Sequence, residues 1–273
     1  NFIKIMDFKH KTLLVTGGCS GIGKIMARKG LERGVSKLII IDINESVLVQ
    51  TKSEFSHWEK EILIYPCDLA DVTQIREVSE KIKNEVGNVD ILINNAGVVT
   101  GKYFHEHTHE NIEQSMLINS CAPMHLTLEF LPEMMVRNHG AVCTVASSAG
   151  LISNPKMSVY AASKWAAVGW SDSVRLEMKQ LGKNISFTTI MPFFINTGMF
   201  DGVKSKMLPM LDPEKTSESI IRAIEKEREM LAMPLPYWFI RFSQGILPLS
   251  VFDWVMRDVL GIYDTMKEFK GRG

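Results

Sequence analysis

Short apolar segments alternate with longer amphipathic stretches along most of the chain. The apolar segments are rich in β-branched residues, as expected for strands that helices cover on both faces. The stretches between them space their apolar positions as helices with one buried face do. This alternation predicts a single α/β domain with a doubly wound, mostly parallel, seven-stranded sheet and right-handed crossovers. The predicted strands are Thr12–Thr16, Leu38–Ile41, Ile62–Tyr65, Ile91–Ile93, Val142–Val145, Ile185–Ile190 and Met230–Met233, and the predicted helices lie around 21–33, 44–57, 71–86, 109–136, 157–181 and 216–229.

The pattern changes after Met233. Residues 234–273 carry closely spaced aromatic residues interrupted by prolines, and no run reaches the roughly 18 uncharged apolar residues that a membrane-spanning helix needs. We predict that this extension belongs to the same domain as residues 1–233. It either adds packing over one edge of the sheet or forms a lid that also touches a membrane or lipid surface, and both can hold. Its aromatic residues include Tyr237, Trp238, Phe239, Phe242, Phe252, Trp254 and Tyr263.

Composition narrows the function classes without choosing among them. Of the 273 residues 45% are apolar, enough for a sizeable core, and 31 basic residues balance 31 acidic ones. This balance argues against nucleic acid as a partner, since a nucleic-acid-binding face is basic. Cys19, Cys67, Cys121 and Cys143 form no C-x-x-C pair, so they predict reduced thiols. Together with the lack of a recognisable secretory signal, they favour a cytosol-facing location.

A glycine-rich segment follows the first predicted strand. Residues Thr16–Gly23 read TGGCSGIG and lead directly into an amphipathic helix. Glycines there allow a tight turn and close approach of the backbone to a pyrophosphate, which the helix N-terminus attracts. Asp42 ends the next strand, nineteen positions after Gly23, close to the roughly twenty expected for a residue that binds the adenosine ribose. Because a carboxylate would repel the 2′-phosphate of NADP, the segment predicts a dinucleotide site that favours NAD.

Further motifs follow in a characteristic order. After the loop Thr16–Gly23, which matches a TGxxxGxG pattern, come Asn94-Asn95-Ala96-Gly97, then Asn119, Ser147 and the Tyr160-to-Lys164 segment. These match the NNAG, Asn, Ser and YxxxK elements of the short-chain dehydrogenase/reductase family, which the chain resembles over residues 12–200. The resemblance implies a Rossmann-type sheet, an NAD(P) cofactor and hydride transfer between an alcohol and a carbonyl compound. It also implies that the catalytic residues are Asn119, Ser147, Tyr160 and Lys164.

The resemblance implies cofactor contacts position by position. Asp68 resembles the residue that contacts the adenine amino group, and Asn94 resembles the one near the adenosine ribose. Residues 192–197 resemble the segment that closes over the nicotinamide and its phosphate. Residues 1–233 would then be the dinucleotide-binding catalytic part of the domain, and 234–273 its lid or membrane-facing element. The expected cofactor-binding residues are Gly17, Cys19, Ser20, Gly21, Ile22, Gly23, Asp42, Asp68, Leu69, Asn94, Ala96, Gly97, Tyr160, Lys164, Pro192 and Thr197.

The segment after Pro192 departs from the Pro-Gly usual in this family. Here Phe193 follows, and the string Pro192–Met199 resembles a lipid-handling branch that includes retinol dehydrogenase 10 and the type 11 and type 13 17β-hydroxysteroid dehydrogenases. The branch implies a hydrophobic substrate such as a retinoid, a steroid or a long-chain alcohol, and peripheral membrane or lipid-droplet association. Helices 109–136 and 157–181 resemble those that pair in homodimers of the family. The apolar residues expected on the substrate side are Phe193, Phe194, Met199, Phe200, Met207, Leu208 and Met210.

The spacing of Tyr160 and Lys164 suggests how a tyrosine acts as an acid or base. Four residues apart on a predicted helix, they share one face. An ammonium about 5 Å from the phenol, at an effective dielectric near 20, favours the phenolate by roughly 3 kcal/mol, or about two pKa units. We therefore predict that Lys164 and the positive nicotinamide of the oxidised cofactor together bring the pKa of Tyr160 toward neutrality, so that Tyr160 takes the alcohol proton. Ser147 would polarise the substrate oxygen, and Asn119 would position a water that links Lys164 to solvent.

Two other functions are compatible with parts of the sequence. The string His105-Glu106-His107-Thr108-His109 satisfies the HExxH pattern of zinc peptidases, which needs both histidines on one face of a continuous helix. Thr108 and Asn111 instead predict a helix N-terminus within the string, so a solvated loop without metal is favoured. The second alternative is a non-catalytic NAD-binding regulator on the same fold. The complete set of four catalytic residues argues against it.

Overall fold

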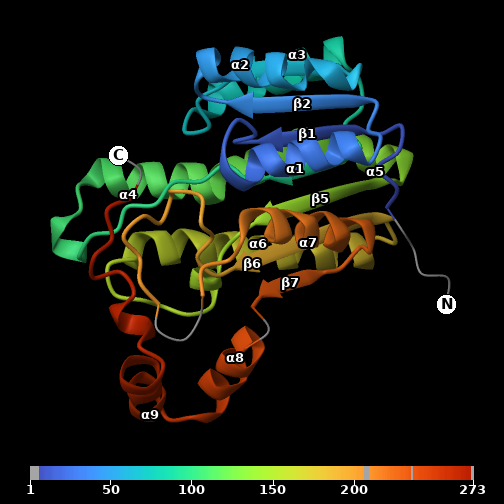
Figure 1. The fold of residues 1–273 in the computed structure, drawn as a ribbon. Coiled ribbons are helices and arrows are strands. Elements are labelled where there is room, and N and C mark those ends of the chain that lie inside the picture. The colour runs from blue at the N-terminus through green and yellow to red at the C-terminus, as the bar shows by residue number, and fades with distance from the viewer. Residues whose placement is uncertain (1–5, 206–208, 235, 272–273) are drawn as a thin grey trace.

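Seven parallel strands form one sheet in the part of the chain that the structure describes, residues 6–205, 209–234 and 236–271 (Figure 1). The structure is a computed structural model. The strand order is β3-β2-β1-β4-β5-β6-β7, which confirms the predicted doubly wound sheet. The strands are β1 (Thr12–Thr16), β2 (Lys37–Asp42), β3 (Glu61–Pro66), β4 (Ile91–Asn94), β5 (Gly140–Val145), β6 (Ile185–Pro192) and β7 (Met230–Met233).

Helices cover both faces of the sheet (Figure 1). They are α1 (Gly21–Glu32), α2 (Glu45–Phe55), α3 (Val72–Glu85), α4 (His109–Met116), α5 (Ala122–Arg137), α6 (Ser158–Gln180), α7 (Pro213–Glu225), α8 (Pro236–Ile246) and α9 (Leu249–Trp254). Residues of α1, α2 and α7 share one buried cluster with Leu13 and Val15, whereas residues of α3, α5 and α6 share another with Leu14. The strands are therefore buried on both faces, which explains why their sequences are continuously apolar.

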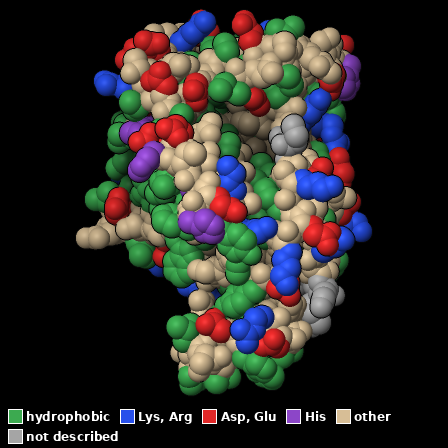
Figure 2. Space-filling model, turned by 90° about the vertical axis from the view of Figure 1, so that its left-hand side faces the viewer, with side chains coloured by type: hydrophobic (Ala, Val, Ile, Leu, Met, Phe, Trp, Pro, Cys, Tyr) green, Lys and Arg blue, Asp and Glu red, His purple; other side chains and the backbone are tan. Residues whose placement is uncertain are grey.

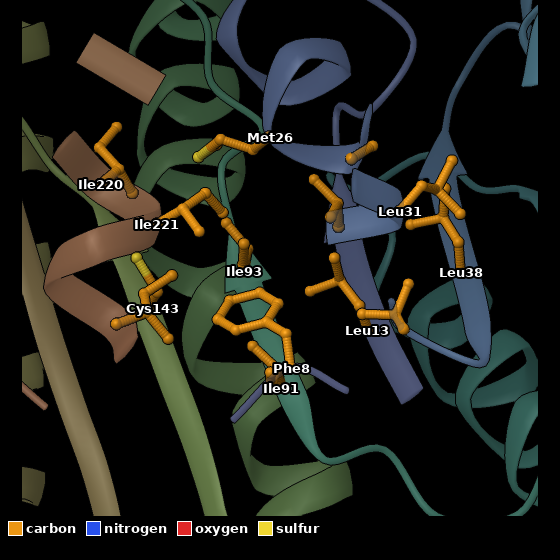
Figure 3. Close-up of a cluster of buried hydrophobic side chains, with 14 of the residues drawn as sticks. Phe8, Leu13, Met26, Leu31, Leu38, Ile91, Ile93, Cys143, Ile220 and Ile221 are labelled. Carbon is orange, nitrogen blue, oxygen red and sulfur yellow. The ribbon is translucent and has the colours of Figure 1, made fainter. Parts of the chain in front are cut away.

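The core between the sheet and the pair α1 and α7 is closed to solvent. Figure 3 shows Met26 of α1 and Ile221 of α7 lying with Leu13, Ile93 and Cys143 of the strands. All five side chains are fully buried. Because burying one such side chain contributes roughly 1.5–3 kcal/mol, this packing holds the strand ends and the helix N-termini in a defined arrangement.

Two helices differ from their predicted bounds. The stretch predicted as one helix at 109–136 is α4 and α5, joined by a π-helical turn at Leu117–Cys121. Such a turn inserts an extra residue, which the spacing of apolar positions does not reveal. Helix α7 lies several residues before the predicted 216–229. The side chain of Asp212 caps it and Pro213 takes its first position, two N-terminal signals that the prediction overlooked.

The extension after β7 projects from the body as α8 and α9, followed by a π-helical turn at Val255–Val259 and a 3-10 turn at Ile262–Asp264 (Figure 1). Its inner side packs on the domain, since Ile240, Phe252 and Met256 share a buried cluster with Met191 of β6. No helix within the described residues is long and apolar enough to cross a membrane.

The strand order reverses between β1 and β4, because the chain runs outward to β3 before it returns. In sheets of this kind the loops diverge at the reversal and leave a crevice at the carboxyl edge of the strands. Figure 2 faces this edge and shows hydrophobic side chains around it and at the projecting lower end.

Candidate active site

The crevice at the carboxyl edge brings most of the predicted site together. It contains a cavity of about 350 Å³ bounded by the loops after the strands β1 to β6 and by α4 and α6. Cys19, Asn94 and Asn119 do not line this cavity. The predicted residues that do line it are Gly17, Ser20, Gly21, Ile22, Gly23, Asp42, Asp68, Leu69, Ala96, Gly97, Ser147, Tyr160, Lys164, Pro192 and Thr197. Lining residues for which the sequence reasoning gave no role include Ile43, Asn95, Val98, Gln114 and Ile118.

The loop after β1 forms a cradle that side chains would fill. Gly17 has a φ of +62°, and a Cβ there would lie 3.0 Å from the Cα of Ala96. A Cβ on Gly23 would collide with the carbonyl oxygen of Gly17. Ser20 is the N-cap residue of α1, so the positive end of the helix dipole opens on the cavity. This arrangement fits the pyrophosphate of a dinucleotide.

Asn95 braces the cradle, a role that the sequence reasoning missed. Its Nδ2 donates to the carbonyl oxygen of Thr16 at 2.9 Å, and its backbone N–H donates to the Thr16 hydroxyl at 3.0 Å. The backbone N–H of Ala96 donates to the same hydroxyl at 3.0 Å. The loops after β1 and β4 are thus tied together across the crevice. The NNAG motif contained this signal, since Asn95 is its second asparagine.

The carboxylate of Asp42 is held by two backbone amides. The N–H of Cys19 donates to one oxygen at 3.3 Å, and the N–H of Ile43 donates to the other at 2.9 Å. A carboxylate has about four acceptor positions, so Asp42 can still accept hydroxyls of a ribose. The Cys19 side chain belongs to the hydrophobic core, so only its backbone faces the predicted cofactor site. Among the described residues that line the cavity, Lys164 is the only lysine or arginine.

Asp68 and Asn94 lie in different surroundings. Asp68 lines the cavity, and its carboxylate accepts the backbone N–H of Ala70 at 2.9 Å. Asn94 is buried on the other side of β4, where its Nδ2 donates to the Thr127 hydroxyl at 3.2 Å. Successive side chains of a strand point to opposite faces, and Asn94 shares its face with Leu92, toward α5. Its side chain is therefore not placed toward the predicted ribose site.

The four predicted catalytic residues come from three elements and lie close together. Tyr160 and Lys164 stand on α6, and the Lys164 Nζ is 5.7 Å from the centre of the Tyr160 ring. Ser147 follows β5, and Asn119 occupies the π-helical turn between α4 and α5. A Cβ on Gly97 would lie 3.1 Å from the Asn119 Oδ1 and 3.5 Å from the Lys164 Nζ, so these two groups flank Gly97.

Hydrogen bonds hold Asn119 and Lys164 in place. The Asn119 Oδ1 accepts the N–H of Val98 at 2.8 Å, and its Nδ2 donates to the Val98 carbonyl at 2.9 Å and to the Ser163 hydroxyl at 3.0 Å. The Lys164 Nζ donates to the carbonyl oxygen of Val145 at 3.0 Å. The π-helical turn thus allows Asn119 to reach the loop after β4, a use of such turns that is common at functional sites.

Burial governs the protonation of the pair. It raises the pKa of Tyr160 to about 12, although a hydrogen bond with Ser147 acts in the opposite direction. It also lowers the pKa of Lys164 to about 8. The prediction that Lys164 and the oxidised nicotinamide together bring the pKa of Tyr160 toward neutrality concerns the NAD complex and stays a prediction. Both side chains are enclosed, so desolvation disfavours both charged forms and outweighs their attraction.

An apolar cluster closes the predicted substrate side of the cavity. The Tyr160 and Phe200 rings meet edge to face with centroids 6.2 Å apart, and Phe200 contacts Phe194 at 4.9 Å. Met266 of the extension, 1% exposed, belongs to the same cluster. Phe193, Met199 and Met210 pack against it, partly buried. Met207 and Leu208 lie outside the described residues, as does the side chain of Tyr237.

The end of the extension forms a strap over the segment after β6. The N–H of Lys270 donates to the carbonyl of Asp201 at 2.8 Å, and the N–H of Lys204 donates to that of Thr265 at 3.2 Å. Gly202 has a φ of +84°, and a Cβ there would collide with the carbonyl oxygen of Glu268. The strap is therefore pressed against residues 201–204.

The HExxH string does not form a continuous helix. Residues Phe104–Glu106 form a 3-10 turn, and α4 begins at His109 with Thr108 and Asn111 as its capping box. The Glu106 carboxylate accepts the N–H of Tyr103 at 2.8 Å. The predicted helix start within the string is confirmed. Within the described residues, no group of three or more His, Cys, Asp and Glu side chains could hold a metal.

The sheet and its cradle define a dinucleotide-binding α/β protein. A model of the short chain dehydrogenase family matches residues 11–208. Epidermal retinol dehydrogenase 2 of Mus musculus is 37% identical over 267 residues, which cover 95% of this chain and 85% of that protein. Retinol dehydrogenase 10 of Homo sapiens is 33% identical over 268 residues, covering 87% of this chain and 78% of that protein. The chain belongs to the short-chain dehydrogenase/reductase family and is an oxidoreductase of the NAD(P) type.

Solved structures agree with this assignment at the level of the fold. A short-chain dehydrogenase/reductase from Burkholderia phymatum in complex with NAD has a TM-score of 0.81 at 23% identity, over 88% of this chain and 95% of that chain. A short-chain dehydrogenase from Sphingobium yanoikuyae in complex with NADPH has a TM-score of 0.76 at 21% identity, over 88% and 97% of the chains. The predicted fold class and family are both confirmed.

Proposed function

We propose that the protein oxidises a hydrophobic alcohol to its ketone or aldehyde with NAD, and that Tyr160 is the general base. The observation that carries the proposal is the position of Tyr160, which lines the cavity shared with the glycine cradle and belongs to the apolar cluster on the substrate side. Hydride transfer requires cofactor, acid-base group and substrate to meet at one point, and Tyr160 lies where the two sides join.

In this proposal each residue of the site has one task. Tyr160 takes the proton of the alcohol hydroxyl, while Ser147 donates a hydrogen bond to the same oxygen and stabilises charge as it develops. Lys164 orders the cofactor ribose, and Asn119 positions a water that links Lys164 to solvent. Bound NAD supplies the hydride acceptor and a positive nicotinamide ring that favours the phenolate. This charge would offset the burial that raises the pKa of Tyr160 to about 12.

The choice of NAD over NADP rests on charge. Asp42 lines the cavity at the end of β2, and Lys164, the only described lysine or arginine of the lining, contacts Val145 beyond the cradle. A 2′-phosphate beside Asp42 would thus meet a like charge without a compensating cation, which disfavours NADP. Residues that would hold NAD are the glycine cradle, Asp42, Asp68 and the segment from Pro192 to Thr197.

The substrate class rests on the apolar cluster and on the relatives. Two relatives are named retinol dehydrogenases, and the cluster around Phe194, Phe200 and Met266 offers an apolar surface to the substrate. Sites of this kind bind hydrophobic ligands and orient them by a few polar groups. A retinoid, a steroid or a long-chain alcohol would suit it.

The extension would act as a lid that also contacts a lipid surface. Its inner side packs on the domain, whereas its outer side exposes many large apolar residues. These residues lie in the part of the chain that projects from the body in Figure 1. An apolar face of this kind is typical of helices that lie in the membrane interface. The exposed residues are Trp238, Phe239, Phe242, Ile246, Leu249, Val251, Trp254 and Val259.

A homodimer is the proposed assembly. Leu128 and Val136 of α5 and Trp165 and Leu176 of α6 are exposed, at 67%, 87%, 45% and 50%. Exposed apolar side chains on both helices support a shared interface. Light scattering on purified protein tests this assembly.

The central experiment follows NADH formation over a panel of retinoids, steroids and long-chain alcohols, with NADP in a parallel series. We expect turnover of one or more hydrophobic alcohols with NAD and little with NADP. Adding lipid vesicles to the same assay, and sedimenting them, tests the lipid contact. NAD binding without turnover across the whole panel would favour the non-catalytic regulator.

A further inference from the structure

A second, smaller cavity lies behind Ser147. It measures about 30 Å³ and is bounded by the turn after β5, by the segment after Pro192, by α8 and by the turn at Ile262. About 10–15 Å³ of such space holds one water, so the cavity can take a group of two or three heavy atoms. Its polar wall groups are Ser147, Ser148 and Asn154, and its other walls are apolar.

The amide of Asn154 is held in one orientation. Its Nδ2 donates to the Thr265 hydroxyl oxygen at 2.8 Å, and that hydroxyl donates its own proton to the Ile262 carbonyl at 2.8 Å. A threonine hydroxyl has one proton, so it can only accept from Asn154. If the amide were flipped, the Asn154 Oδ1 would face the Thr265 hydroxyl oxygen, and neither atom could donate to the other. The extension therefore determines where the Asn154 Oδ1 points.

The Asn154 Oδ1 is buried and has no hydrogen-bond partner among the described residues. A buried acceptor without a partner is costly, and proteins rarely retain one unless a water or ligand completes it. This acceptor belongs to a wall residue of the cavity behind Ser147. The cavity thus suits a small group that brings a hydrogen-bond donor to the Asn154 Oδ1.

We propose that Asn154 determines substrate specificity by accepting a hydrogen bond from a second hydroxyl of the substrate, close to the carbon that reacts. The inference rests on the proposed function, in which Ser147 contacts the reacting oxygen. A second hydroxyl in the cavity would donate a hydrogen bond to the Asn154 Oδ1, whereas a purely hydrocarbon group would leave this oxygen unpaired. The substrate class is then a lipid-like diol, with a long hydrocarbon part on the apolar cluster.

The test compares dodecan-2-ol with dodecane-1,2-diol in the NADH assay. Wild-type protein should use the diol with a kcat/KM at least about tenfold higher. The variant Asn154→Leu should lose this advantage while its use of dodecan-2-ol stays the same or improves. Ile152→Val, which enlarges the same cavity without touching the acceptor, is the matched control and should keep the preference. Thr265→Val, which frees the amide to flip, should reduce the preference several-fold and serves if Asn154→Leu does not fold.

The outcomes separate this inference from the proposed function. Equal use of both alcohols by wild-type protein would overturn the inference and leave the proposed function intact. If neither alcohol is oxidised, the proposed function fails for long-chain alcohols. The role of Asn154 is then tested by the binding of the two alcohols. With NAD present, the diol should then raise the Tm of wild-type protein more than dodecan-2-ol does, and Asn154→Leu should abolish the difference. Equal Tm values, or an ordered water that stays on the Oδ1 in a diol-bound crystal structure, would overturn the role.

Discussion

The cofactor side and the substrate side of the crevice are built in different ways. On the cofactor side the contacts come from backbone and from residues at strand ends, as where the amides of Cys19 and Ile43 hold Asp42. On the substrate side, side chains from distant segments make the wall, as where Phe200 and Met266 meet Tyr160. A backbone cradle tolerates almost no change, whereas an apolar wall can be repacked by side chains of similar volume. Local motifs thus predict a dinucleotide cofactor, whereas a prediction of the substrate class needs the assembled wall.

Tyr160 lies where the two sides join, so its loss should have the largest effect. The variant Tyr160→Phe should lower kcat by about 10²–10⁴-fold, because the alcohol proton then has no acceptor. Its affinity for NAD, measured by calorimetry, should stay close to that of wild-type protein. Tyr65→Phe removes a phenol that is buried elsewhere, bonded to Glu85, and should keep its turnover. Near-normal turnover of Tyr160→Phe would remove Tyr160 from the role of base.

A change on the cofactor side alone should alter cofactor choice and leave substrate choice unchanged. The variant Asp42→Asn keeps an acceptor for the Cys19 amide but removes the charge that would repel a 2′-phosphate. Because a like-charge contact costs several kcal/mol, the ratio of kcat/KM for NADP over NAD should rise by at least about tenfold. The measurement is NADPH and NADH formation with one alcohol. An unchanged ratio would contradict the charge argument.

A change on the substrate side alone should alter the use of the alcohol and leave cofactor choice unchanged. The variant Gly202→Ala places a methyl group against the carbonyl of Glu268 and a side chain at a φ of +84°. It should displace the strap, raise KM for the alcohol several-fold and lower the free energy of unfolding by about 1–3 kcal/mol. Gly198→Ala has a similar φ of +82° but nothing within 4 Å, so it separates backbone strain from the collision. If both variants behave alike, the strap contact is not the cause.

The smallest effect on activity is expected at the surface between α1 and α7. Partial burial acts to raise the pKa of Glu218, but hydrogen bonds from Arg33, Lys29 and Arg222 lower it to about 2. Since this value lies below the ordinary 4.5, Glu218 stabilises the fold fully above about pH 4.5 and loses that contribution as the pH falls toward 2.

The variant Glu218→Gln should accordingly lower the free energy of unfolding by about 1–2 kcal/mol at pH 7, with little change in turnover. Urea unfolding at pH 7 and at pH 3 measures the difference, which should shrink at the lower pH. Glu214→Gln removes a more exposed partner on the same helix and should cost less. A difference that is the same at both pH values would contradict the ion-pair interpretation.

Most of the fold could be predicted, because a buried parallel strand is recognisable from a short apolar run. The exceptions have physical reasons. The π-helical turn at Leu117–Cys121 preserves the apolar pattern on both of its sides, so the stretch looked like one helix. The start of α7 depended on the capping Asp212, a local signal that the apolar spacing of later residues outweighed.

The candidate site shows the same division. The glycine cradle and Asp42 were predicted, whereas Asn95 was left without a role because its motif does not say which way each side chain points. Asn94 was expected beside the cofactor, and the alternation of β4 turned it toward Thr127. The spacing gives the distance from Tyr160 to Lys164 but not their burial, which raises the pKa of Tyr160 and lowers that of Lys164.

The sequence by itself determined the order of strands and helices, the cradle, the acidic residue beside it and the set Asn119, Ser147, Tyr160 and Lys164. These depend on spacing within a few residues, which is local. Only the tertiary structure decided which distant groups surround them, as where Asn154 meets Thr265 across 111 positions of the chain. Burial, and with it the pKa of Tyr160 and the unpaired Asn154 oxygen, arises from the packing of the whole domain, so no local pattern can encode it.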